Sequence, residues 1–362
     1  MRRRLHQILA MLGFRVERWG TFEERNHRHQ AFLQNLDRQI GQIAARQSLI
    51  EEHLGAAAGS SSVGREPDEF EKFINELEYI SIESTNHCGY HCHMCPHDGI
   101  KRPKGFQSIE DLQWLLKNIR AYRPEYAGYF YLHGSGDPLL DKQLADKIAL
   151  IRENLPDSNI RFYSTLGYDL PDGLFEKYIL AGLNAIFVSF YGINRQSYEK
   201  VHGVDRFDTA LANLVNAAAL QGKYPSRFTV HVTGPFKVDD HAGHEAFKQK
   251  INDLGLSNYA DGVIHNFAKM DFNALAMPVK PCSIYRGPLS RILQIDWDMK
   301  VIPCCLVMDQ EVVFGDLREK PLREIFYDSP WTDFREAHQK MKLKEKYPFC
   351  WRCMHDTNEW NK

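Results

Sequence analysis

The stretch CGYHCHMCP, residues 88–96, places three cysteines within eight residues. They are Cys88, Cys92 and Cys95. The stretch directly follows residues 79–85, a β-rich run that predicts the first strand of the main domain. Thiolates are soft ligands that favour iron–sulfur clusters or zinc, and three of them leave one metal position open, as catalysis requires. The alternative is a zinc site completed by His87, His91 or His93.

The chain of 362 residues has an ordinary globular composition, with 43% hydrophobic and 25% charged residues. Its 45 basic and 47 acidic residues argue against a dedicated nucleic-acid binder. The first apolar stretch lacks a signal-peptide cleavage site, and no run of 18 apolar residues predicts a spanning helix. We therefore expect a reducing, cytoplasmic setting, in which clustered cysteines are metal ligands rather than disulfide partners.

From residue 79 onward, short β-rich runs alternate with helix-like segments. The predicted strands are residues 79–85, 129–133, 160–165, 185–190, 228–233 and 263–267, and the helices include residues 109–119, 140–154, 174–181 and 209–221. This alternation predicts an α/β fold with a parallel sheet and helices outside it. Six such units over about 190 residues suit a partial (β/α)6 barrel better than an eight-fold barrel, which needs about 250 residues.

The chain divides into four predicted segments. They are a helical and heptad extension over residues 1–54, a linker over residues 55–67, the partial barrel over residues 68–270 and a C-terminal domain over residues 271–362. The linker is small and polar, as flexible linkers are. The C-terminal domain holds five of the eight cysteines, and its sequence predicts an irregular structure that a metal would stabilise.

Two features of the N-terminal extension suggest an interaction. Residues 1–19 predict a basic amphipathic helix, which either lies on an anionic membrane surface or packs on the protein's own body. Residues 33–54 carry about three heptads, which indicate either a homodimer or a helix packed on the core.

The spacing C-x3-C-x2-C after the first strand of a partial barrel resembles the hallmark of the radical S-adenosylmethionine (SAM) enzymes. The resemblance implies that Cys88, Cys92 and Cys95 hold a [4Fe–4S] cluster whose fourth iron is chelated by SAM. An electron from that cluster would cleave SAM to methionine and a 5′-deoxyadenosyl radical, which abstracts hydrogen from unactivated carbon. Met94 stands where the family often has an aromatic residue against adenine, so that contact is not carried over.

Further resemblances follow along the chain. Residues 133–139, HGSGDPL, look like the family's G-G-E-P motif, whose backbone meets the SAM amino group. The resemblance implies SAM contacts at Gly134, Ser135, Gly136 and Asp137, and glycine permits such close backbone approach. The family also places polar residues at later strand ends against SAM, which implies Ser164 and Ser189 here. The alternative for both serines is a hydrogen bond to nearby backbone.

A second set of cysteines lies near the C-terminus. Its members are Cys282, Cys304, Cys350 and Cys353. Spacing alone allows either a tetrahedral zinc site or an auxiliary [4Fe–4S] cluster. However, residues 300–304, 315–317 and 322–326 resemble the SPASM/Twitch extensions of radical SAM enzymes, which implies one auxiliary cluster and hence two [4Fe–4S] clusters in the chain.

Cys305 is then the spare cysteine. Radical SAM epimerases return a hydrogen atom from such a thiol, so the resemblance implies a catalytic hydrogen donor at Cys305. Alternatively, Cys305 is a small buried core residue, or it exchanges roles with Cys304.

Three functions remain open from the sequence. The cysteine content resembles that of Twitch-type dehydrogenases and epimerases, which implies a small-molecule substrate, a sugar or aminocyclitol, and an electron donor such as flavodoxin. The second hypothesis is a peptide-modifying SPASM maturase. The third is a zinc-stabilised interaction protein that assembles through the heptad.

Overall fold

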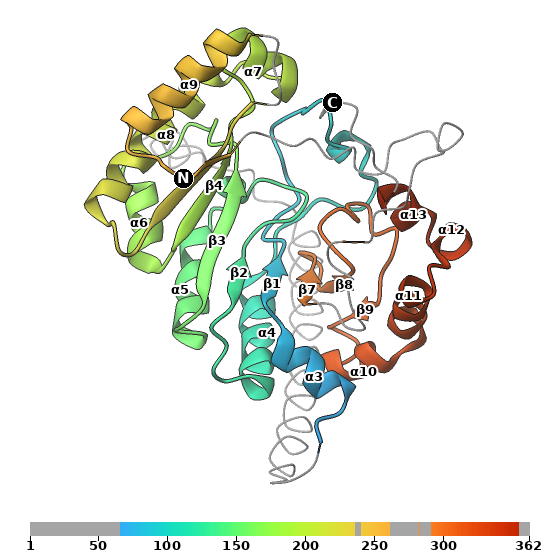
Figure 1. Cartoon of the computed structure of the whole chain (residues 1–362). Coiled ribbons are helices and arrows are strands. Elements are labelled where there is room, and N and C mark those ends of the chain that lie inside the picture. The colour runs from blue at the N-terminus through green and yellow to red at the C-terminus, as the bar shows by residue number, and fades with distance from the viewer. Residues whose placement is uncertain (1–65, 236–239, 261–281, 283–290, 355–362) are drawn as a thin grey trace, which may run out of the picture. The chain divides into compact units, whose positions relative to one another are not determined.

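The computed structural model describes residues 66–235, 240–260, 282 and 291–354 (Figure 1). The chain divides into two units, residues 1–61 and 62–362, and every described residue belongs to the second. The predicted extension, its heptad and the strand expected at residues 263–267 lie outside the described residues.

One sheet runs through the described part of the chain in the order β6-β5-β4-β3-β2-β1-β7-β8-β9. Its strands are β1 (Tyr79–Ile82), β2 (Tyr129–Tyr131), β3 (Asn159–Ser164), β4 (Ala185–Ser189), β5 (Thr229–Thr233), β6 (Tyr259–Ala260), β7 (Ile292–Ile295), β8 (Lys300–Ile302) and β9 (Gly315–Asp316). Strands β1 to β7 pair in parallel, and β8 and β9 are antiparallel. The sheet does not close, so the expected α/β partial barrel is confirmed.

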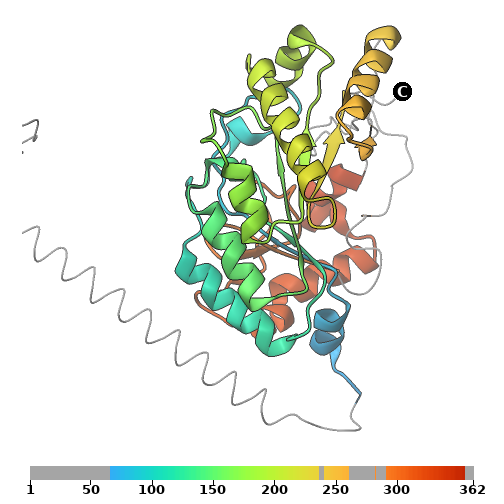
Figure 2. The same ribbon diagram turned by 90° about the vertical axis from the view of Figure 1, so that its left-hand side faces the viewer.

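Helices cover one face of the parallel strands (Figures 1 and 2). They are α4 (Ile109–Tyr122), α5 (Leu144–Asn154), α6 (Leu174–Ala181) and α8 (Phe207–Lys223). Alternate strand residues point toward them, and Ile80, Phe130 and Phe162 are fully buried there. Because side chains alternate between the faces of a strand, the intervening residues lie on the inner face of the partial barrel.

Two further helices flank the carboxyl ends of the strands. They are α7 (Arg195–His202) and α9 (His241–Asp253). Short 3-10 turns, η1 (His97–Gly99) and η2 (Pro138–Leu140), follow the cysteine stretch and the glycine motif. Asn194 accepts from the backbone of Ser197 and so begins α7, and Gly203, with a φ of 69°, ends it.

The C-terminal part is regular, so the prediction of an irregular domain is wrong for its described residues. After the β7–β8 hairpin and β9 come α10 (Leu322–Tyr327), α11 (Ser329–Gln339), α12 (Leu343–Lys346) and α13 (Pro348–Met354). Phe326 and Trp331 from this part pack on Phe73 of α3 (Glu69–Glu76), with ring centroids 5.2 and 5.4 Å apart. This aromatic core was missed because its members lie more than 250 residues apart in the sequence.

In the described part of the chain, no helix is both long enough and apolar enough to cross a membrane.

Candidate active site

The three cysteines of residues 88–95 lie together in the loop that follows β1. Burial, the charge of Asp137 and, to a smaller extent, the charge of Cys95 together raise the pKa of Cys88 to about 12. The pKa of Cys92 is raised by burial and by the charges of Cys95 and Cys88. Three partly buried thiols in one loop would repel one another as thiolates unless a cation compensated them.

The end of α7 holds this loop in place. The backbone N–H groups of His91 and His93 donate to the carbonyls of His202 and Val201, at 3.1 and 2.9 Å. The Cys92 Sγ lies 3.4 Å from Nδ1 of His202, a fully buried side chain. Burial lowers the pKa of His202 to about 3, which keeps its ring neutral.

The glycine motif after β2 packs on the same loop. A side chain at Gly136 would place its Cβ 2.5 Å from the carbonyl oxygens of both Thr85 and His87. A Cβ at Gly134 would lie 2.7 Å from the side chain of Glu83. These glycines therefore permit a close approach of the turn to Glu83, Thr85 and His87, the residues that lead into the cysteine loop, whereas their contact with SAM remains a prediction.

Asp137 of the same motif joins three strand ends. Its backbone N–H donates to the carbonyl of His87 at 2.9 Å. Its carboxylate accepts from the Ser164 hydroxyl at 3.0 Å and from the backbone and hydroxyl of Thr165 at 3.1 Å. Burial raises the pKa of Asp137, and these hydrogen bonds counteract that rise. The carboxylate thus fixes the glycine turn relative to β1 and β3.

The two predicted serines lie in different surroundings. Ser164 is 4% exposed, on the helix side of β3, and its hydroxyl also accepts from the backbone of Leu166 at 3.0 Å. Ser189, at the end of β4, lies on the inner face, where the Tyr191 hydroxyl donates to it at 3.2 Å. Ser189 therefore faces the interior of the partial barrel, whereas the Ser164 hydroxyl is occupied by internal hydrogen bonds.

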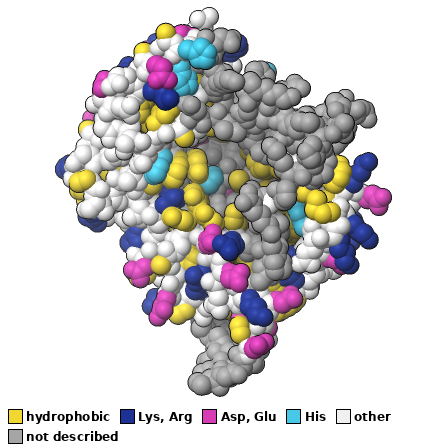
Figure 3. Space-filling model, viewed as in Figure 1, with side chains coloured by type: hydrophobic (Ala, Val, Ile, Leu, Met, Phe, Trp, Pro, Cys, Tyr) yellow, Lys and Arg dark blue, Asp and Glu magenta, His cyan; other side chains and the backbone are white. Residues whose placement is uncertain are grey.

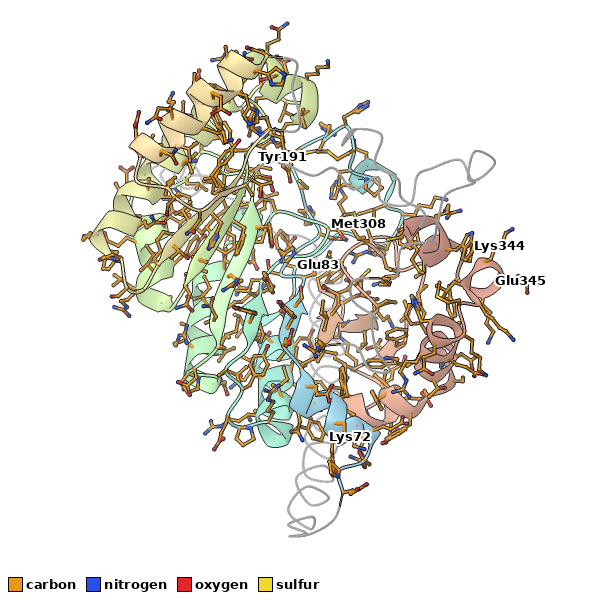
Figure 4. The ribbon with its side chains drawn as sticks, viewed as in Figure 1. Lys72, Glu83, Tyr191, Met308, Lys344 and Glu345 are labelled. Carbon is orange, nitrogen blue, oxygen red and sulfur yellow. The ribbon has the colours of Figure 1, made fainter. Side chains whose placement is uncertain are left out.

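A buried ionic group joins the glycine motif to the C-terminal part. The Nη2 of Arg102 donates to both carboxylate oxygens of Glu83 at 2.8 Å and to the Ser135 hydroxyl at 3.0 Å. Its Nε donates to the carbonyl of Met308, which lies near Glu83 in Figure 4. The Ser135 backbone also donates to Glu83, at 2.8 Å. Ser135 is therefore fixed by its neighbours at the carboxyl end of β2.

The inner face of the sheet carries a continuous row of stacked rings. We call it the aromatic wall, and its members are Tyr79, Tyr129, Tyr131, Tyr163, Phe187 and His231. Adjacent ring centroids lie 4.3–6.0 Å apart. The guanidinium of Arg161 lies 4.0 Å from the centre of the Tyr129 ring. Figure 3 shows hydrophobic side chains with histidine and a basic side chain gathered over the middle of the sheet.

The second set of cysteines lines one cavity of about 30 Å³ in the C-terminal part. All four predicted members, Cys282, Cys304, Cys350 and Cys353, belong to its wall, together with Pro303, Phe334, His338, Phe349 and Met354. Burial, and then the charges of neighbouring cysteines, raise the pKa values of Cys304 and Cys350. Four thiols from three separate segments thus converge in apolar surroundings.

Cys305 differs from its neighbour Cys304. The residues that line the cavity include Cys304 but not Cys305. Burial raises the pKa of Cys305, and the charge of Asp296 at the end of β7 adds to this rise. The pKa of Tyr163 in the aromatic wall is raised by burial, then by Tyr131 and then by the charge of Cys305. Cys305 is therefore within electrostatic range of both Asp296 and Tyr163.

The donor sets fit iron–sulfur clusters. Both groups consist of free, partly or fully buried cysteines, the soft donors that such clusters require. Two of the three histidines proposed as a fourth zinc ligand have other partners: His91 Nδ1 lies 2.9 Å from Asp98, and the His87 ring stacks on Phe106 with centroids 4.7 Å apart. Across the residues that the structure describes, no three His, Cys, Asp or Glu side chains are arranged to hold a single metal ion.

Sequence reasoning missed several residues that shape the site. Arg102, Arg161 and His202 carry no motif of their own, and each acts through a partner distant in sequence. The His202-Gly203 pair signals the end of a helix, but nothing in the sequence shows that this helix meets Cys92.

Comparisons with known proteins agree with this arrangement. Residues 82–246 match the family model "Radical SAM superfamily", and residues 287–354 match "Iron-sulfur cluster-binding domain" (SPASM). The crystal structure of BtrN in complex with AdoMet and 2-DOIA is similar over 77% of this chain and 92% of that chain, with a TM-score of 0.50 and 16% identity. Native anSMEcpe with bound AdoMet is similar over 76% and 88%, with a TM-score of 0.55 and 13% identity.

The relatives that are similar in sequence are named as cyclases. The probable GTP 3′,8-cyclase of Saccharolobus solfataricus is 28% identical over 178 residues, 49% of this chain and 53% of that protein. The GTP 3′,8-cyclase of Cronobacter sakazakii is 28% identical over 149 residues, 39% of this chain and 43% of that protein. The chain thus matches about half the length of these curated relatives.

The domains that match imply SAM and iron–sulfur clusters as cofactors. The cysteine loop and the glycine motif lie inside the first matched segment, and Cys304, Cys350 and Cys353 lie inside the second, whereas Cys282 precedes it. The chain therefore carries a radical SAM domain over residues 82–246 and a SPASM domain over residues 287–354.

Proposed function

We propose that this radical SAM enzyme removes a hydrogen atom from a carbon of a carbohydrate or aminocyclitol and yields an epimer or an oxidised alcohol. The aromatic wall is the observation that carries the substrate class. Saturated rings present C–H groups on their faces, and these pack well on aromatic faces, which bear partial negative charge. Arg161, above the wall, would donate to hydroxyl or anionic groups of the same ligand.

The two cysteine groups would hold the two clusters. In this proposal Cys88, Cys92 and Cys95 bind the first cluster, and Cys282, Cys304, Cys350 and Cys353 bind the second. Bound SAM and the first cluster supply the 5′-deoxyadenosyl radical that takes hydrogen from the substrate carbon. Three ligands at the first site leave one iron for SAM, whereas four ligands close the second site.

SAM would lie against the carboxyl ends of β1 to β4. In this proposal the backbone of Gly134, Ser135 and Gly136 would meet SAM at this end of the barrel, in the glycine turn that Asp137 fixes. Ser189 would add a polar contact from the inner face. Asp137 and Ser164 would act indirectly, because their side chains already bond each other at 3.0 Å.

Cys305 would decide the outcome of the reaction. In epimerisation its S–H bond breaks, a new C–H bond forms on the opposite face of the substrate radical, and the sulfur is left one electron short. One electron and one proton then restore the thiol, the electron coming from a reductant such as flavodoxin. In oxidation the substrate radical would instead lose its hydroxyl proton and one electron, which the second cluster would accept, and become a ketone. The electrostatic influence of Cys305 on Tyr163 of the aromatic wall supports the first outcome.

The test uses anaerobically reconstituted full chain, as wild type and Cys305→Ala. Each is incubated in D2O with SAM, dithionite and a panel of nucleotide sugars and aminocyclitols, and mass spectrometry follows 5′-deoxyadenosine and the recovered substrate. One deuterium gained with wild type and lost with Cys305→Ala would support an epimerase. A loss of two hydrogens from a sugar with both proteins would support a dehydrogenase.

Two other substrate classes belong in the same panel. A peptide is included because anSMEcpe, a structural neighbour, was crystallised with bound AdoMet and the Cp18Cys peptide. GTP is included because sequence relatives are named GTP 3′,8-cyclase. Deoxyadenosine formed with either of these and with no sugar would overturn the carbohydrate assignment.

Protein that binds zinc and no iron would favour the interaction protein instead. We propose a reducing cytoplasm as the setting.

A further inference from the structure

We propose that His202 is a positioning residue for the first cluster, and that its Nδ1–H donates a hydrogen bond to the sulfur of Cys92. The inference rests on the proposed cluster site. It goes beyond that site because it assigns a tuning role to a residue outside the cysteine motif.

The hydrogen-bond partners of the ring determine which nitrogen carries the proton. The backbone N–H of Tyr191 points at Nε2 of His202, at 3.3 Å. A backbone N–H is always a donor, so Nε2 must accept and cannot carry a hydrogen. In a neutral ring the hydrogen then resides on Nδ1, which lies 3.4 Å from the Cys92 Sγ. The doubly protonated ring is incompatible with the Tyr191 contact.

Tyrosine rings hold the imidazole in this orientation. Tyr191 stacks on it with an interplanar angle of 15°, and Tyr198 lies 4.1 Å from it between ring centroids. Tyr90 meets it edge-on at 5.3 Å. Tyr191, labelled in Figure 4, follows the end of β4, so the ring is fixed from the sheet as well as from its own helix. His202 is fully buried, which excludes water as a competing partner.

The same turn of α7 also fixes the backbone on both sides of Cys92. The carbonyls of His202 and Val201 have no partner within the helix, and they accept from His91 and His93 of the cysteine loop. A Cβ at Gly203 would lie 2.5 Å from the His91 carbonyl, so the loop packs tightly on the helix end. The N–H···S contact thus stands beside the two backbone hydrogen bonds and the 2.9 Å hydrogen bond between the Tyr90 and Tyr198 hydroxyls, which also join α7 to this loop.

A hydrogen bond to a cluster sulfur has a defined consequence. It withdraws electron density from the thiolate and stabilises the reduced cluster, which carries more negative charge. His202 would therefore make the first cluster easier to reduce. Because neither His202 nor Tyr90, Tyr191 and Tyr198 around it line the second cavity, the second cluster should not respond to its replacement.

The experiment is a redox titration of the reconstituted full chain, followed by electron paramagnetic resonance. The signal that changes on SAM addition identifies the first cluster. In His202→Phe, which keeps a ring but removes both nitrogens, we expect a ratio of reduced to oxidised first cluster about tenfold smaller at a fixed potential. His202→Gln, which keeps a donor, should restore part of the ratio. His91→Phe, on the same loop but paired with Asp98, should leave it unchanged.

Unchanged reduction of the first cluster in His202→Phe, with full iron content, would overturn the inference and leave the cluster site intact. Failure of the wild type to bind iron would overturn the proposed function instead. If His202→Phe fails to fold, nitrogen-15 NMR spectra of the wild type with oxidised clusters show which ring nitrogen of His202 carries the hydrogen. The signal of His202 is assigned by its absence in His202→Gln. A neutral ring with hydrogen on Nδ1 is expected, and hydrogen on Nε2 would overturn the proposal.

Discussion

The two cysteine sites differ in how the chain assembles them. The first draws its three thiols from eight consecutive residues after β1, and its neighbours are polar: the carboxylate of Asp137 and the imidazole of His202. The second draws its four thiols from three segments spread over about seventy residues, and apolar side chains dominate its cavity. The first site thus depends on local geometry and hydrogen bonds, and the second depends on the folding of the C-terminal part.

This difference suits two different tasks. Polar partners near a cluster allow its potential and its open iron to be tuned, as a catalytic cluster requires. A closed set of ligands among apolar side chains shields a cluster and stabilises the domain around it. We therefore expect substitutions at the first site to abolish the cleavage of SAM, and substitutions at the second site to lower both the iron content and the stability.

The largest effect is expected in the second site, where replacement of two adjacent cysteines should change the iron content differently. Cys304→Ala should lose one of the two clusters, about half of the iron, because Cys304 lines the cavity. Cys305→Ala should keep all of the iron, because Cys305 lies outside the cavity wall. Iron and sulfide analysis of both reconstituted variants checks this. The reverse pattern would mean that the two residues exchange roles.

Acid should lower the free energy of unfolding through a histidine of the partial barrel, His133. Burial lowers the pKa of His133, beside Tyr163 in the barrel, to about 4, whereas an unfolded histidine titrates near about 6.5. Between these values the unfolded state binds more protons, so the free energy of unfolding should fall by about 2–3 kcal/mol as pH drops from 6.5 to 4.

Urea unfolding of the wild type and His133→Gln across this pH range measures the effect. The variant should lose part of the slope, since its side chain does not titrate. His91→Gln serves as the matched control, because His91 lies exposed on the cysteine loop. An identical slope in wild type and His133→Gln would show that His133 does not contribute.

A smaller effect is expected where the glycine motif meets the cysteine loop. Gly136→Ala places a methyl group 2.5 Å from two backbone carbonyl oxygens, which must move apart. Such overpacking costs about 1–3 kcal/mol of folding free energy. The variant should also bind less iron at the first site. Gly99→Ala is the control, because its Cβ meets no atom within 4 Å. Equal stability of the two variants would contradict the close approach.

The smallest effect should distinguish the two serines of the first site. Ser164→Ala removes one hydrogen bond to Asp137 and one from Leu166, and we expect a loss of about 1–2 kcal/mol in unfolding free energy. SAM affinity should change little, because this hydroxyl faces away from the barrel interior. Ser189→Ala should instead weaken SAM binding and leave stability unchanged. Equilibrium binding of SAM to both reconstituted variants measures this difference. Weaker SAM binding by Ser164→Ala than by Ser189→Ala would contradict the assignment.

The sequence predicts the first site better than its surroundings. The cysteine spacing is local, and β1 to β5 alternate clearly enough that each lies within a residue or a few of its predicted bounds. Helix α6 matches its prediction at both ends. The second site required a resemblance, because its four thiols come from three segments. The aromatic wall escaped prediction because each strand contributes one or two rings, and their stacking depends on the parallel register.

The two sites can be separated most directly by counting iron and SAM cleavage in the same variants. Wild type should bind about eight irons per chain, as expected for two [4Fe–4S] clusters. Cys92→Ala should lose the first cluster and all reductive cleavage of SAM. Cys350→Ala should lose the second cluster but still cleave SAM to 5′-deoxyadenosine. If Cys92→Ala retained its cleavage, or if Cys350→Ala kept all of its iron, the assignment of the two sites would be contradicted.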